Sequence, residues 1–156
     1  MPPRAASERM GRRFDDFRLG ERWETHGRTI GEADILAFAA LTGDWNPVHV
    51  DETVAAPLHG GRIAHGTLMP GLAWGMLRQH DLIDGTVLAL KSLEWEFLAP
   101  VRIGDTLRVT AEVAACSPHP TTPRGRVTFA LGLVNQRGET VNRGMCTLVM
   151  QKQREE

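Results

Sequence analysis

Cysteine is scarce in this sequence of 156 residues: Cys116 and Cys146 are the two present, and they form no Cys-x-x-Cys pair. This count excludes a disulfide-stabilised scaffold and is typical of a reducing compartment, so we expect a cytoplasmic protein. The sequence also lacks the run of about 18 apolar residues that a membrane span requires, so no membrane partner is expected. The N-terminal segment has positive charge but no apolar centre, which excludes a secretory signal.

Basic residues are not in excess, since 18 Lys and Arg stand against 19 Asp and Glu. No stripe of basic residues alternates with aromatic residues, and nucleic-acid binding is therefore not expected. Hydrophobic residues make up 42% of the chain, enough for one domain with a substantial core. We expect a disordered N-terminal tail over residues 1–13 and a single domain over residues 14–156.

Two segments of the first half have helical patterns. Apolar residues recur at helical spacing from Glu32 to about Leu41, which predicts an amphipathic helix. Thr29 and Glu32 have the spacing of a capping box, and Gly43 is placed to end the helix. The segment 67–79, TLMPGLAWGMLRQ, is apolar nearly all round, which predicts a buried helix wrapped by a sheet.

The second half alternates between apolar and polar residues, as half-buried strands do. Leu93, Trp95 and Phe97, for example, share one parity. A weaker alternation over residues 23–30 indicates a further short strand. Strands joined by short turns form an antiparallel sheet with one covered face, so the sequence predicts an α+β fold. The expected long strands are 87–97, 107–113, 127–133 and 139–150.

The connection from Asp44 to Gly66 has no clear period, apart from a possible short helix over residues 52–56. Pro47 keeps this part of the chain extended or turned, so Asp44 and His49 can face one space. A carboxylate and an imidazole around one water can divide the proton transfers of an acid–base reaction. The alternative is an Asx turn beside a surface histidine, and the spacing alone leaves both open.

His65, Gly66 and Thr67 come directly before the expected buried helix. Free N–H groups at a helix start can bind a developing oxyanion, and Gly66 leaves room for a carbonyl to approach. A simple turn with a structural histidine is the alternative. Asp51 is expected to cap the short helix that follows it.

A metal site is a competing interpretation, because four possible ligands are close in sequence. No helical metal signature is present and the spacings fit no compact site, so we expect no metal. The sequence also contains no P-loop, no G-x-G-x-x-G and no G-x-S-x-G. The four residues are His49, Asp51, His59 and His65.

The run GDWNPVHVD, followed by GRIAHGTLMPGLAW, resembles the MaoC-like dehydratase family, the (R)-specific enoyl-CoA hydratases. The resemblance covers about residues 20–150 and includes RTIGEADILAFAALTGD and FLAPVRIGDTL. It implies a hotdog fold, in which a long antiparallel sheet wraps around a central buried helix. It also implies a homodimer or a larger assembly of dimers.

By position, Asp44 and His49 match the catalytic pair of the family, and Gly66 matches the glycine whose N–H binds the thioester oxygen. Asn46, His65 and Thr67 are expected to bind the substrate. The implied reaction is reversible addition of water to a 2-enoyl thioester. No metal, nicotinamide or flavin cofactor is required, because the thioester itself makes the α-proton acidic; the substrate carries CoA or acyl carrier protein. Arg62, Arg78 and Arg102 are candidates for a CoA phosphate.

Two other functions share the thioester and the helix start. One is a hotdog thioesterase, which would hydrolyse the substrate and release a free thiol. The other is a non-catalytic subunit that binds acyl thioesters. The presence of Asp44, His49 and Gly66 together favours the hydratase over both. Trp45 and His59 depart from the family pattern and indicate a short or unusual acyl group.

Overall fold

The computed structural model describes residues 10–153. Its six strands form an antiparallel sheet in the order β1-β4-β5-β6-β3, with β2 pairing β4 beside this path. The strands are β1 (Arg22–Glu24), β2 (Arg28–Thr29), β3 (Val87–Phe97), β4 (Thr106–Pro118), β5 (Arg124–Val134) and β6 (Thr140–Gln151). The helices are α1 (Glu32–Thr42), α2 (Pro47–Val50), α3 (Glu52–His59) and α4 (Leu68–Leu77), with 3-10 turns η2 (Phe14–Asp16) and η3 (Arg78–His80).

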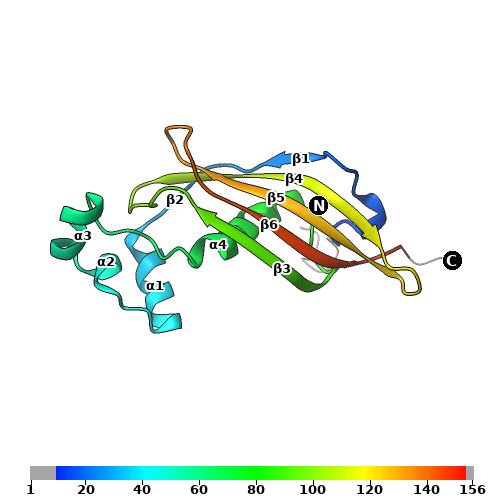
Figure 1. The fold of residues 1–156 in the computed structure, drawn as a ribbon, viewed down its shortest axis with the longest axis horizontal. Helices are drawn as coiled ribbons and strands as arrows, with labels where there is room; N and C mark the ends of the chain where they lie inside the picture. Colours follow the sequence, from blue (N-terminus) through cyan, green and yellow to red (C-terminus); the bar gives the residue numbers. More distant parts are fainter. Residues whose placement is uncertain (1–9, 154–156) are drawn as a thin grey trace, which may run out of the picture.

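The expected α+β arrangement is confirmed: the sheet packs on α4, and α1, α2 and α3 gather beyond one end of the strands (Figure 1). Alternation places one parity of each central strand in the core, where it is removed from water. These core residues are Leu107, Val109, Ala111 and Val113 of β4, Val127, Phe129, Leu131 and Leu133 of β5, and Cys146, Leu148 and Met150 of β6.

Helix α4 is buried on one side only in a single chain. Met69, Ala73 and Leu77 are buried against the sheet, whereas Gly71 and Gly75 are exposed. The sheet packs against this helix as expected, but over residues 10–153 it covers one side of the helix and leaves the other open. The physical reason is that the sheet packs along one stripe of the helix, and the stripe of small residues remains open.

Helix α1 begins with a different cap from the one expected. The Asp34 carboxylate accepts the N–H of Gly31 at 2.9 Å, so the cap pairs these residues rather than Thr29 and Glu32. Thr29 lies in β2 instead, where its hydroxyl is hydrogen-bonded to that of Thr106. The end of the helix is as expected, because Gly43 adopts φ 78° there.

Residues 1–9 of the expected tail lie outside the described residues. Residues 11–13 are hydrogen-bonded to the domain: Gly11 donates to Asp84, Arg12 to Leu82, and the Arg13 guanidinium to Gln151. The boundary after residue 13 is therefore too late for the described part of the chain. None of the helices over residues 10–153 is long and apolar enough to cross a membrane.

Candidate active site

Asp44 and Asn46 lie in the turn before α2, where hydrogen bonds fix their positions. The Asn46 N–H donates to Asp44 Oδ1 at 3.2 Å, and Asn46 Oδ1 caps α2 by accepting the N–H of Val48 at 3.4 Å. Pro47 occupies the first position of α2, where its missing N–H costs nothing. The Asx turn that the sequence left as an alternative is thus present, and it also sets the direction of Asp44.

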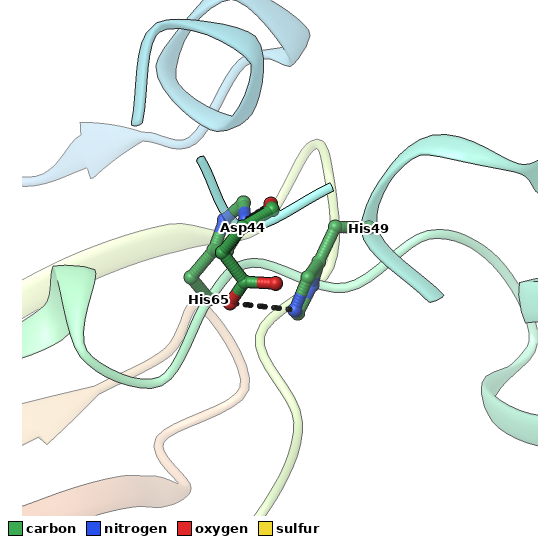
Figure 2. Close-up of side chains that lie close together, drawn as sticks. All are labelled: Asp44, His49 and His65. Atoms are coloured by element: carbon green, nitrogen blue, oxygen red, sulfur yellow. Dashed lines mark hydrogen bonds and ion pairs between the residues drawn. The ribbon is translucent and has the colours of Figure 1, made fainter. Parts of the chain in front are cut away.

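Asp44 and His49 face each other across this turn, with Asp44 Oδ2 4.0 Å from His49 Nε2 (Figure 2). His49 is buried, while the Asp44 side chain is half exposed. His49 Nδ1 lies 2.8 Å from the carbonyl oxygen of Ile63. A carbonyl can only accept, so Nδ1 carries a proton, and Nε2 is the ring nitrogen that faces Asp44.

His65 packs behind this pair and is only 1% exposed. Its ring stacks on His49 at a centroid distance of 3.8 Å, with Phe38 on another side at 5.0 Å. His65 Nε2 donates to the backbone carbonyl of Asp44 at 2.9 Å. The ring therefore holds the Asp44 backbone and the His49 imidazole, and it does not line the cavity beside them.

Gly66 and Thr67 lead into α4 with free amides. Among residues 10–153, no acceptor takes the N–H of either residue, whereas the Gly66 carbonyl accepts the N–H of Met69. A Cβ on Gly66 would lie 2.9 Å from the ring of Phe97, so a larger residue would fit here only if that exposed ring moved. The helix start thus has the donors that an oxyanion requires.

A cavity of about 280 Å³ opens between His49 and Gly66 and continues among apolar side chains. This volume is at the low end for a small-molecule pocket, which suits a short apolar group. The remaining lining residues are Ile63, Ala64, Met69, Phe97, Leu98, Ala99, Pro100, Val101 and Asn142.

The other residues expected to bind substrate lie outside this cavity. Asn46 and Thr67 are exposed, and Thr67 borders a separate hollow beside α4. Asp51 caps α3 as expected, accepting the side-chain O–H and the N–H of Thr53. These hydrogen bonds lower the pKa of Asp51. Sequence reasoning missed Asn142, although a polar residue at the parity of Cys146 was a visible signal.

The three arginines proposed for a CoA phosphate all have protein partners. Arg62 bonds Glu32 of α1 at 2.6 Å and Glu52 of α3 at 3.1 Å. The bond to Glu32 is the main cause of the raised pKa of Arg62. Arg78 pairs with Asp84, and Arg102 donates to the carbonyl of His59. Each of the three guanidinium groups thus already has a protein partner, and binding of a CoA phosphate stays a prediction.

Asp44, His49 and His65 also meet the distance requirement for a metal site, with one possible ligand atom from each within 4.8 Å of the others. This set differs from the four residues that are close in sequence, since Asp51 and His59 are not part of it. Each histidine bonds a backbone carbonyl through one ring nitrogen and has the other available. These three side chains could bind either a water molecule or a metal ion.

The fold class follows from solved structures. A MaoC-like dehydratase from Rhodospirillum rubrum is 28% identical, with a TM-score of 0.79 over 93% of this chain and 100% of that chain. A Mycobacterium tuberculosis protein described as a double hotdog fold superposes with a TM-score of 0.81 at 23% identity, over 94% of this chain and 46% of that chain. The chain therefore has the hotdog fold.

The sequence comparisons give the family. The MaoC-like domain model matches residues 16–132. A 3-hydroxybutyryl-CoA dehydratase from Methylorubrum extorquens is 38% identical over 76% of this chain and 74% of its own length. An (R)-specific enoyl-CoA hydratase from Rhodospirillum rubrum is 39% identical, over 67% and 72% respectively. This chain belongs to the MaoC-like family.

Proposed function

We propose that this chain is a hydro-lyase that adds water reversibly to a 2-enoyl thioester of CoA. The observation that carries the proposal is the meeting of Asp44 and His49 at 4.0 Å beside the free amide of Gly66. A separation of 4.0 Å is too long for a direct hydrogen bond and suits one bridging water. The names of the relatives from M. extorquens and R. rubrum support the same reaction.

In the proposed mechanism, the acyl group lies in the cavity with its thioester oxygen at the Gly66 N–H. The Asp44–His49 pair takes one proton from the water, whose oxygen bonds to the β-carbon. The electron pair of the double bond moves toward the thioester oxygen, and the pair then delivers one proton to the α-carbon. The Gly66 N–H stabilises the enolate-like oxygen, a contribution of about 3 kcal/mol in comparable sites.

A homodimer belongs to the proposal. β3 is an edge strand with apolar side chains exposed, Leu90 and Leu93 among them. These side chains border a hollow of about 450 Å³ that is continuous with the open face of α4 at Gly71. An unpaired apolar edge of this length favours pairing with the same edge of a second copy.

The free thiols Cys116 and Cys146 suit a reducing, cytoplasmic location.

The test is a crotonyl-CoA assay that follows the enoyl absorbance and free thiol together. The proposal expects loss of the enoyl signal without thiol release. Thiol release would instead identify a thioesterase, and no change in either signal over a panel of acyl-CoA thioesters would indicate a non-catalytic chain.

The acid–base pair is tested by Asp44→Asn and His49→Ala. Each variant is expected to lower turnover about 10²-fold or more, because one proton-transfer group is lost. Thermal melting checks that each variant keeps the fold, which is expected for Asp44→Asn because the Asp44 side chain is half exposed. A variant with near-normal turnover would show that its residue is not part of the chemistry.

EDTA treatment decides between a water-based pair and a metal ion bound by Asp44, His49 and His65. Activity is expected to be unchanged after prolonged chelation and desalting. Loss of activity that Zn²⁺ or Mn²⁺ restores would assign the three residues to a metal site instead.

A further inference from the structure

Apart from His49, Asn142 is the one polar side chain among residues 10–153 that lines the cavity. It lies on β6 at the parity of Cys146, Leu148 and Met150, which face the core, and it is 1% exposed. Its cross-strand neighbour is Phe97, the ring that packs on Gly66. The buried amide therefore belongs to the space in which the acyl group is proposed to lie.

Trp95 fixes the orientation of this amide. The indole Nε1–H donates to Asn142 Oδ1 at 2.9 Å. An indole N–H can only donate, so the atom that receives it must be the amide oxygen. The indole lies across β6 because Gly144 has no side chain: a Cβ there would come within 2.3 Å of the ring. The NH₂ group of Asn142 is thereby held in one direction.

Both hydrogens of this NH₂ group lack a protein partner. No acceptor among residues 10–153 takes either of them. An acyl group bound in the cavity would cut this NH₂ group off from water. An acyl group with an oxygen at this point would replace the lost hydrogen bond and would therefore be favoured over one without. The purely hydrocarbon wall that a simple fatty acyl group requires is absent at this position.

We propose that Asn142 determines substrate specificity, by donating a hydrogen bond to an uncharged oxygen, such as a hydroxyl or a carbonyl, on the acyl chain. This inference rests on the proposed hydratase function. An uncharged oxygen is favoured over a carboxylate, because no Lys or Arg lines the cavity and a buried carboxylate requires a countercharge. The small volume restricts such groups to short acyl chains.

The experiment compares pairs of substrates that differ by one atom group. 5-Hydroxy-2-pentenoyl-CoA is matched with 2-hexenoyl-CoA, and 4-hydroxy-2-butenoyl-CoA with 2-pentenoyl-CoA, so that a hydroxyl replaces a methyl at two depths. For the wild-type chain, kcat/KM is expected to favour the hydroxylated member of at least one pair by about tenfold or more. In Asn142→Leu, which has nearly the same volume, that preference is expected to be lost or inverted.

Asn142→Asp provides the second variant. It retains an acceptor for Trp95 and removes the two donors, so it is expected to lose the preference as Asn142→Leu does. Circular dichroism and thermal melting show whether each variant folds, and either folded variant is sufficient. If the ratio of kcat/KM between the hydroxylated substrate and its matched partner is the same in wild type and variants, the assignment of Asn142 is overturned and the hydratase function stays intact. A wild-type chain that hydrates none of the four substrates, nor crotonyl-CoA, overturns the proposed function itself.

Discussion

The His65 imidazole connects the two proposed catalytic residues without touching the cavity. It stacks on His49 and donates to the backbone carbonyl of Asp44. Small displacements in an active site are costly to turnover, because the reacting groups must be held within a fraction of an ångström. His65 is therefore a positioning residue, and its contribution differs from that of the pair it supports.

His65→Phe retains the stacked ring and removes the hydrogen bond. Turnover is expected to fall about 10²-fold with little change in KM, since Asp44 loses its anchor and the acyl cavity is unaltered. His65→Gln restores a donor and is expected to recover part of kcat. His80→Phe is the matched control, because His80 makes the same kind of bond to the carbonyl of Glu24, far from the site. Normal kcat in His65→Phe would contradict the positioning role.

At the scale of elements, the sequence correctly predicted the helices and strands that show one regular pattern of apolar residues. The strand over 87–97 coincides with β3, and α1 was found to within a residue. The segment 44–66 was harder, because it has no clear period and Pro47 indicated an extended or turned chain. In the structure Pro47 opens α2 and Pro57 lies inside α3. Local propensity cannot reveal this, since tertiary contacts stabilise these short helices.

Those tertiary contacts join residues that are far apart in the sequence. Arg62 holds Glu32 on α1 and Glu52 on α3, and no spacing rule connects the three. Asn142 likewise becomes part of the cavity only because β6 pairs with β3. The proximity of Asp44 and His49 could be predicted from one short segment, whereas the wall of the cavity beside them depends on the assembled sheet.

Asp51 allows a prediction about α3. Asp51→Ala removes the N-terminal cap and is expected to lower the melting temperature at neutral pH. The Thr53 hydrogen bonds lower the folded-state pKa of Asp51, so its stabilising effect is present above the unfolded pKa and is lost as the pH falls. The difference in melting temperature should therefore shrink below about pH 3.9. Asp51→Asn, which also caps, should remain close to wild type at neutral pH; equal destabilisation by both variants would contradict the capping role.

At the scale of the whole molecule, the open face of α4 and the edge strand β3 form one continuous apolar surface. Thr67, Gly71, Leu90 and Phe97 all border its hollow. Phe97 also packs on Gly66 at the mouth of the acyl cavity. A second copy placed on this surface would therefore cover both α4 and one wall of the active site. This links the proposed dimer to activity as well as to stability.

Light scattering after gel filtration tests the dimer. The wild-type chain is expected at twice its mass of 17.2 kDa, and Leu90→Lys at the monomer mass, because it places a charge in the apolar contact. Leu41→Lys is the matched control, since Leu41 is exposed on α1, away from this surface, and should stay dimeric. A dimeric Leu90→Lys would place the interface elsewhere. A monomeric Leu90→Lys with full turnover would confirm the position of the interface but show that activity does not depend on the dimer. Phe97 would then hold its position on Gly66 without a partner chain.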